Sequence, residues 1–475
     1  MKLRLSTLIL AAAALSASAQ ELRTSYFMET STYRHEMNPA LLDQPYVAMP
    51  LVLGNLNFGT TGNVGAANFV YKMQPSWQGY GQGRDLTTFM HPDVDRNEFL
   101  NGLRDRNNLG MYLKYQLVGV GFKAFGGMNS VDLSLRSNTN VSLPKDLFAF
   151  MKETGTQDEY DISNIGLNSQ TYLELGLGHS RQINDRLRVG AKLKILLGLA
   201  YARFNASNLH VQMNDNQWAV SGQASLTASA LGAEFKYKEG KNYVDPETGE
   251  TTSRERINGL SDDLKGKIGG AGMAVDFGAT YKVIPDLTLS AAITDLGFIS
   301  WRNALRASTP NSTWTFDGFK NDVYVDGNTD TGHNKIGDQL DDIGDDLGNL
   351  FSLYDDGQKS RAQMLAATLN VGAEYTLPAY RKLRFGFLYT SRIAGRYSWH
   401  QGMLSANVRP IKAIEVSANV AASSSGITCG AVVDFRAPHF NFFIGTDRFV
   451  GKLSKQYIPL HSFNSNVSLG MSFPL

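Results

Sequence analysis

The chain has 475 residues, and its 45 basic and 44 acidic side chains leave a formal net charge of +1 at pH 7. This balance gives no case for nucleic acid as a partner, because nucleic-acid-binding proteins present a basic surface. The single cysteine, Cys429, excludes an internal disulfide. The 46 glycines, 20 tyrosines and 25 phenylalanines favour a β-rich fold such as a barrel.

Residues 1–19 have the order of a secretory signal peptide. A positively charged start is followed by a short apolar stretch at 8–15 and by a small-residue cleavage site, Ala17-Ser18-Ala19. The apolar stretch is too short to cross a bilayer, which takes about 20 residues. We therefore expect an exported chain whose mature part begins near Gln20.

The segment from residue 20 to residue 50 does not alternate between apolar and polar side chains. Its centre holds Arg34, Glu36 and the tripeptide Asn38-Pro39-Ala40. Proline has no N–H and fixes φ, so Pro39 favours a bend or the first turn of a short helix over a continued strand. The segment is expected to form a unit of its own ahead of the strands.

From residue 51 onward the dominant pattern is alternation with a period of two. Between residues 187 and 201 one face is apolar, and the opposite face begins with basic residues and glycine. This segment exceeds the ~5–6 residues usual in soluble proteins and is long enough for a tilted membrane strand of ~9–11 residues. Similar alternation recurs at 273–282, 287–294, 365–375, 383–390, 414–421 and 467–473.

Alternation alone fits both a soluble β-sandwich and a membrane barrel. Connection lengths favour the barrel, because short turns such as 183–185 and 283–286 alternate with long stretches. We predict an all-β, antiparallel transmembrane β-barrel over residues 51–475, with 14–16 strands and about 16 by direct count. The long loops expected on the extracellular side are 74–108, 144–165, 239–268 and 302–360.

Four basic residues form a row that points into the lumen on this interpretation: Arg186, Arg188, Lys192 and Lys194. One role for them is to attract an anionic head group of a ligand. The other is to pair with inward acids such as Glu174 or Glu36. Pairing is favoured because a buried charge usually needs a partner.

The last long loop contains a strongly acidic segment, with 11 Asp and 2 Lys between residues 317 and 356. Apolar residues recur there at helical spacing from Ile336 to Tyr354, which predicts one amphipathic helix. Such a helix either caps the barrel mouth or meets a partner, or it packs on the rim with a solvated acidic face. Packing on the rim, with the acidic face in solvent, is the favoured alternative.

Catalytic motifs are not evident. The sequence has no HExxH, CxxC or P-loop pattern, and His179 and His400 sit on strands far apart in the chain. Cys429 falls on an apolar row of its strand, so we expect it to face lipid as an inert side chain. We expect neither enzymatic activity nor a cofactor or metal site.

Asn38-Pro39-Ala40, placed soon after the signal peptide, resembles the start of the long-chain fatty-acid transporter family of outer-membrane barrels. The stretch from Asp295 to Trp301 is similar to an uncharacterised, domain-of-unknown-function family of such barrels, related to the outer-membrane component of type IX secretion. The resemblance implies that residues 20–50 fold into the lumen as a hatch, with Arg34, Glu36 and the tripeptide as gating residues. The chain departs from that pattern at Leu41, where glycine is frequent.

These features predict a protein of the cell outer membrane, in contact with its lipids and inserted by the barrel-assembly machinery. Two functions stay open. One is a hatch-gated channel or transporter for a hydrophobic or amphipathic small molecule, and the other is a non-transporting barrel that serves as a secretion or assembly partner or as structure. A side opening with an apolar pocket above the hatch would favour the first. A lumen filled with paired charges and an apolar patch on the outer loops would favour the second.

Overall fold

The computed structural model describes most of the chain from residue 21 onward. The described residues are 21–49, 54–81, 85–154, 156–214, 217–238, 243–244, 251–252, 256–261, 266–310, 312–316, 350–424, 426–449 and 464–475. The predicted signal peptide and most of the predicted acidic helix therefore lie outside the described residues.

Antiparallel strands form a closed barrel with 14 positions around its wall. The last strand pairs with the strand before it and with the first strand position, which closes the circle. The wall strands are β2 (Leu56–Gly62) with the short β1 (Tyr46–Ala48), β5 (Arg106–Ala124), β6 (Gly127–Pro144), β8 (Gly166–Gln182), β9 (Leu187–Met213), β15 (Gly270–Ile284), β16 (Leu287–Ser308), β19 (Ala367–Thr376), β20 (Leu383–Ile393), β21 (Trp399–Ile411), β22 (Ile414–Ser423), β23 (Gly426–Arg436), β24 (Asn441–Thr446) and β25 (Ser465–Pro474).

The barrel prediction is thus confirmed, with the strand number at the low end of the expected range. Our direct count of 16 was too high. The segment near 205–213 continues β9 and takes no wall position of its own. Apolar side chains face outward and polar side chains inward, as a membrane barrel requires and a soluble sandwich does not. Cys429 is exposed on the outer face, as expected.

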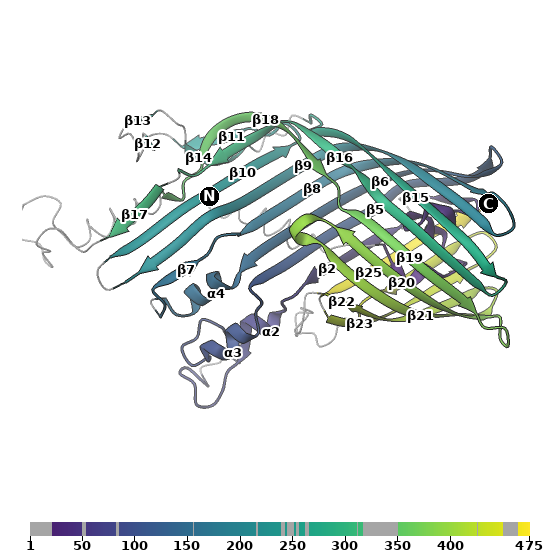
Figure 1. The fold of residues 1–475 in the computed structure, drawn as a ribbon, viewed down its shortest axis with the longest axis horizontal. Helices are drawn as coiled ribbons and strands as arrows, with labels where there is room; N and C mark the ends of the chain where they lie inside the picture. Colours follow the sequence, from purple (N-terminus) through teal and green to yellow (C-terminus); the bar gives the residue numbers. More distant parts are fainter. Residues whose placement is uncertain are drawn as a thin grey trace, which may run out of the picture.

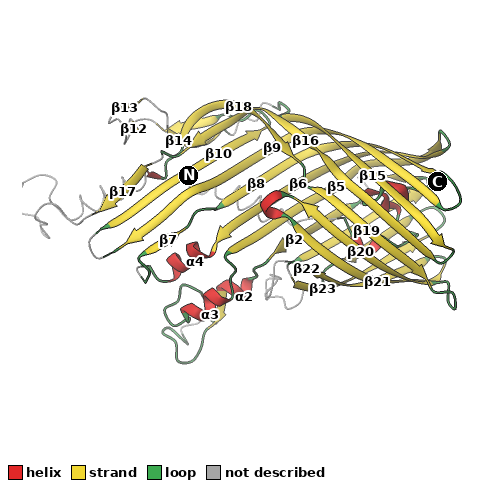
Figure 2. Cartoon of the chain, viewed as in Figure 1, coloured by secondary structure: helices red, strands yellow, loops and turns green. Residues whose placement is uncertain are grey.

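The two ends of the barrel differ in their connections. Short turns join β5 to β6, β8 to β9 and β15 to β16 at the end where the C-terminus lies (Figure 1). The opposite end carries the long connections and all the α-helices. Figure 2 shows the helices projecting from it. Its elements are α2 (Ala66–Phe69), β3 (Val70–Lys72), β4 (Leu86–Thr88), α3 (Arg96–Asn101), α4 (Lys145–Lys152), β7 (Glu159–Asp161), β10 (Trp218–Ala230), β11 (Phe235–Lys238), β12 (Tyr243–Val244), β13 (Thr251–Thr252), β14 (Arg256–Leu260), β17 (Ser312–Phe316), β18 (Tyr354–Met364) and η5 (Gly395–Tyr397).

The wall is tall on one side and short on the other. Strands β5, β6, β8, β9 and β16 run for 17–27 residues, whereas β19 to β25 run for 6–13. β10 pairs with the outer half of β9, in line with β15 on the inner half. The long strands therefore extend well past the rim of the short side (Figure 1).

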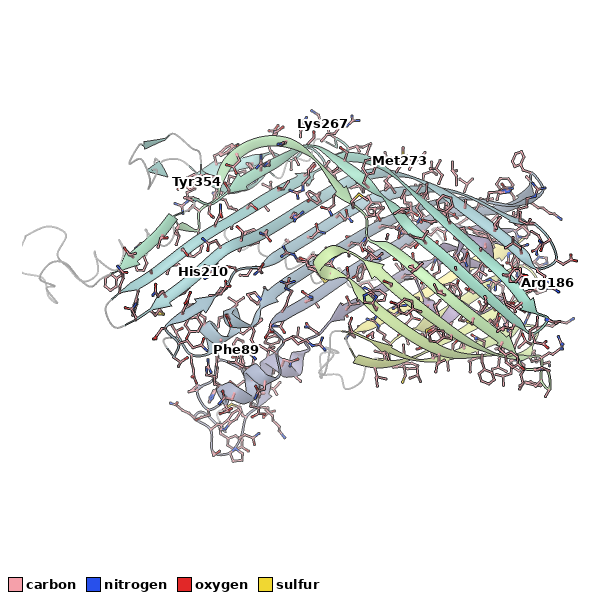
Figure 3. The ribbon with its side chains drawn as sticks, viewed as in Figure 1. Phe89, Arg186, His210, Lys267, Met273 and Tyr354 are labelled. Atoms are coloured by element: carbon pink, nitrogen blue, oxygen red, sulfur yellow. The ribbon has the colours of Figure 1, made fainter. Side chains whose placement is uncertain are left out.

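A small lobe with an aromatic core packs on this extension. Phe99 of α3 stacks on Phe89 with ring centroids 4.5 Å apart, and Phe148 of α4 lies at their edge. Figure 3 shows Phe89 beside α3 in this lobe. Val211 of β9 belongs to the same cluster, so the lobe is fixed to the tall wall. These contacts give the outer end a core of its own.

The predicted helix from Ile336 to Tyr354 is wrong over its last four residues, because residues 351–353 are not helical and Tyr354 begins strand β18. Residues 317–349 of that loop lie outside the described residues. Across the described part of the chain, no helix has the length and apolar character needed to cross a membrane.

The outer face yields a test on one strand. Leu404, near the middle of β21, is 64% exposed and Ile411, at its short-turn end, is 55% exposed. Leu404→Arg should cost about 2–4 kcal/mol of folding free energy, because arginine then lies near the bilayer centre. Ile411→Arg should cost only about 0–1 kcal/mol near the interface. Folding titrations in lipid vesicles measure both costs, and equal values would contradict the proposed membrane position.

Candidate functional site

The N-terminal segment fills the lumen. Residues 21–42, here called the plug, form three short 3₁₀ helices: η1 (Arg23–Ser25), η2 (Thr32–Glu36) and η3 (Pro39–Leu41). Most of their side chains are buried. η3 contacts β8, β9 and β15, while η1 contacts β22 and β23 on another part of the wall. The plug therefore bridges the lumen.

The tripeptide Asn38-Pro39-Ala40 lies directly against the wall. Asn38 caps η3 by accepting a hydrogen bond from the Ala40 N–H at 3.0 Å, and its amide donates to the Ala279 carbonyl at 3.4 Å. The wall here carries Gly190 and Gly278, which pair across β9 and β15. A Cβ on Gly190 would overlap the Pro39 backbone, and one on Gly278 would overlap the Asn38 side chain. Two glycines thus make the seat for the tripeptide.

Arg34 and Glu36 of the plug have different partners. Arg34 pairs with Asp43, just past the end of the plug, and so ties the plug to the connection that leads into β1. Glu36 faces the wall, where its carboxylate lies 2.8 Å from the Lys114 Nζ and accepts a hydrogen bond from Asn55 at 2.8 Å. Of the two charges, Glu36 therefore forms the ion pair with the wall, whereas Arg34 acts on Glu374 of β19 at longer range.

The predicted luminal row divides into two parts. Lys192 and Lys194 are buried in the lumen and paired: the Lys192 Nζ lies 2.9 Å from Asp132, and the Lys194 Nζ lies 2.7 Å from Asp276. Arg188 donates to the Leu42 carbonyl of the plug at 3.2 Å.

Arg186 was assigned wrongly to this row. It precedes the first residue of β9 and is exposed in the turn between β8 and β9. Figure 3 shows it at the short-turn end. The alternation was extended one residue too far, into a turn where the two-residue period no longer applies.

A buried ionic network surrounds Asp295 of β16. Its carboxylate accepts from the Lys194 Nζ at 2.6 Å and from the Arg136 guanidinium at 3.0 Å. Arg136 also lies 3.0 Å from Glu174 and 3.3 Å from Glu21 of the plug. Sequence analysis weighed Glu174 as a partner but did not find Arg136 or Asp295, although Arg136 sits on the inward row of β6. Their partners are far apart in the chain, so no local pattern reveals them.

Asp295 also marks a break in the wall. Its φ of +60° is unusual for a residue other than glycine, so β16 is strained there. On one side of this point β16 pairs with β19 as far as Thr294, and on the other it pairs with β18 from Phe298 onward. β20 pairs with β19 but not with β18 among the described residues. The wall therefore divides at the rim of its short side.

A cavity of about 510 Å³ lies at this division. Its inner lining includes Asn140 and Gln170 on the luminal faces of β6 and β8. Its outer lining includes Leu296 and Met364, whose side chains are 44% and 61% exposed on the outer surface. The cavity thus connects the lumen beyond the plug with the outside of the wall. A second cavity of about 160 Å³ shares Asn140 and Tyr397 with it.

The glycine seat can be tested directly. Gly190→Ala should displace η3 and loosen the plug, because the new Cβ meets backbone atoms that cannot rotate away. We expect a folded barrel with more frequent open-channel events in planar bilayers. Gly402→Ala on β21 is the control, since a Cβ there meets only Phe387, at 3.8 Å. Identical conductance in Gly190→Ala and the parent would contradict the seat.

The chain is similar to one protein family and to several solved barrel structures. No curated protein sequence matches the chain. Among solved structures, the toluene transporter TbuX of Ralstonia pickettii aligns with 8% identity over 93% of both chains at a TM-score of 0.42. The toluene transporter TodX of Pseudomonas putida aligns with 10% identity over 96% of this chain and 94% of its own, at a TM-score of 0.39. A Pseudomonas aeruginosa FadL homologue aligns with 10% identity over 92% of this chain and 91% of its own, at a TM-score of 0.37. These scores are too low to carry an argument, so the fold rests on the strand pairing above. The model of a family of unknown function, DUF5723, matches residues 39–447, and the chain belongs to that family.

Proposed function

We propose that this protein lies in the outer membrane and passes an amphipathic small molecule through the opening in its wall, with the plug as the gate. The observation that carries the proposal is the cavity of about 510 Å³, which has an exposed apolar side and a polar luminal side. A soluble ligand with a purely polar surface would gain nothing from Leu296 and Met364. An amphipathic ligand would match both sides.

The way the plug is held supports a gating role. Besides its apolar contacts, it is fixed by Thr24, whose N–H donates to Asp447 at 2.7 Å, and by Thr30, whose N–H donates to Glu415 at 2.9 Å. Glu36 adds its ion pair with Lys114. Water or a ligand can replace such polar partners when the plug moves. Apart from its covalent continuation into β1, the plug is therefore held by apolar packing and by polar contacts that can be replaced.

A second candidate function is that of a secretion or assembly partner. It is favoured by the outer lobe, where Val70, Leu86 and Met90 are exposed apolar side chains. Exposed apolar groups gathered on one lobe mark interaction surfaces in many proteins. The paired charges in the lumen also favour this candidate. The opening in the wall has no role in it, which is why we place transport first.

Deletion of residues 21–45, with the signal peptide kept, tests the gate. The shortened barrel should fold, shown by heat-modifiable gel migration, and conduct more in planar bilayers than the parent. A second variant, Ala366→Trp, fills the wall cavity that Ala366 lines. It should lower uptake of a fluorescent dodecyl-chain amphiphile by cells several-fold.

Ala418→Trp is the matched control, because Ala418 is exposed on the lipid-facing surface of β22, away from the cavity. It should leave uptake at the parental rate. A folded deletion variant with parental conductance, together with full uptake in Ala366→Trp, would reject transport and leave the partner function.

A further inference from the structure

We infer that the outer half of the lumen holds a site for an anionic, hydroxyl-rich group, the chemistry of a carboxylated or phosphorylated sugar. The site is the luminal side of the wall cavity. Strands β6, β8 and β9 form one side of it, and β20 with η5 forms the other. The inference shares with the proposed function only the cavity. It adds the chemistry of the polar part of the ligand.

Amide side chains cover the wall at this level. Asn138 pairs across the strands with Gln170, Asn140 pairs with Asn168, and Asn205 follows on β9. All five line the cavity. An amide donates and accepts hydrogen bonds at once, as a sugar hydroxyl does. Nearer the short turns the same luminal faces carry the paired charges of Arg136 and Lys194. The amide layer adjoins this network, because Asn138 and Gln170 line a small gap together with Arg136 and Asp295.

Several polar atoms of this layer lack partners. The Gln170 side chain is 5% exposed, and its Oε1 has no hydrogen-bond partner within the part of the chain that the structure describes. The same holds there for the Asn168 Oδ1 and the Arg392 Nε. A buried polar atom without a hydrogen-bond partner lowers the stability of the fold, and such atoms are rare in proteins. Both donors and acceptors are open, which a hydroxyl-rich ligand can satisfy.

The cavity is also electropositive. Its lining contains Arg203, Arg392 and Arg396 and no acidic residue among those described. Arg392 donates to Asn138 at 3.1 Å and lies 4.8 Å from the centre of the Tyr112 ring. Arg396 donates to Asn205 at 3.2 Å. Guanidinium groups held in this way bind a carboxylate or phosphate with two hydrogen bonds.

This positive excess is confined to the outer level. Lys114, Lys192 and Lys194 deeper in the lumen each lie within 3 Å of a carboxylate. None of the three arginines of the cavity lies within 4.0 Å of a carboxylate in the described ranges. The adjoining cavity of about 160 Å³ repeats the pattern, with Arg104 and Arg448 and no acidic residue in its described lining. Asp295 and Asp447 act on Arg392 and Arg448 at longer range, but no described carboxylate forms an ion pair with the arginines of the two cavities, so a bound anion would complement them.

The ligand has two sources. A free acidic saccharide can enter from outside, or the headgroup of a membrane glycolipid can reach in past Leu296 and Met364 on the outer surface. Both present the same anion and hydroxyl groups to the arginines and amides. A hydrocarbon would leave the amides unsatisfied, and a bare anion would use only the arginines.

Titration calorimetry on the purified full-length barrel, with its plug in place, tests the site. Glucose 1-phosphate should bind. Glucose, which lacks the anion, and dodecyl phosphate, which lacks the hydroxyls, should each bind weaker by about tenfold or more. Gln170→Met and Arg392→Met should weaken glucose 1-phosphate by a similar factor. Thr171→Val, beside Gln170 but on the outer face of β8, should not.

Arg392→Lys provides a second variant if Arg392→Met fails to fold, and it should also weaken binding because lysine cannot form the bidentate contact. Barrels in nanodiscs with and without lipid A separate the two sources. If lipid A competes with glucose 1-phosphate, the ligand is the glycolipid headgroup. If lipid A does not compete, the ligand is the free saccharide.

No binding of glucose 1-phosphate would show a water-filled vestibule only and overturn the inference. Equal binding of dodecyl phosphate, or unchanged binding in both Gln170→Met and Arg392→Met, would also overturn it. Because the measurement needs no passage through the barrel, failed uptake with intact binding would reject transport alone.

Discussion

Charge compensation inside the lumen is the constraint on which the rest of the structure depends. A charge removed from water is tolerated only when an opposite charge and hydrogen bonds replace the water. The wall brings Lys114 and Arg136 inward, and the plug brings Glu36 and Glu21 to meet them. Without the plug, part of this network would lose its partners. Plug and wall therefore specify each other, and the glycine seat at Gly190 and Gly278 fixes where they meet.

The same constraint explains why the outer half of the lumen differs. Glu21, at the start of the plug, reaches the inner edge of the amide layer beside Asn138 and Gln170. Beyond it, the lining of the wall cavity holds three arginines that form no ion pair with a described carboxylate. At that level the wall also divides, at the strained Asp295. Lys194 and Arg136 hold the Asp295 carboxylate inward, so the network that anchors the plug also fixes the strained backbone beside the opening. Gate and opening are thus connected through one set of buried charges.

The barrel was predictable because its signal is local and repeated. Alternation predicted the inward positions of Lys192 and Lys194 and the outward position of Cys429 from neighbouring residues alone. It failed where the period of two ends. Arg186 was placed in the lumen although it lies in a turn, and the expected total of about 16 strands was too high.

The site itself could not be predicted, because its parts come from distant segments. Asp295 lies 159 residues from Arg136 and 101 residues from Lys194. The stretch 365–375 was expected to alternate without interruption. The structure shows that β18 ends at Met364 and β19 begins at Ala367, which is where the opening lies. Only the pairing of both strands with β16 reveals that break.

A double-mutant cycle on Glu36 and Lys114 tests most directly whether charge compensation holds the plug. The readout is the open probability of the barrel in planar bilayers, converted to a free energy of plug release. Glu36→Gln and Lys114→Met should each loosen the plug, because each leaves one buried charge uncompensated. The double variant should be looser than the parent by less than the sum of the two effects, with a coupling of about 0.5–3 kcal/mol. Additive effects of the two substitutions, or an open probability that neither substitution changes, would contradict the account.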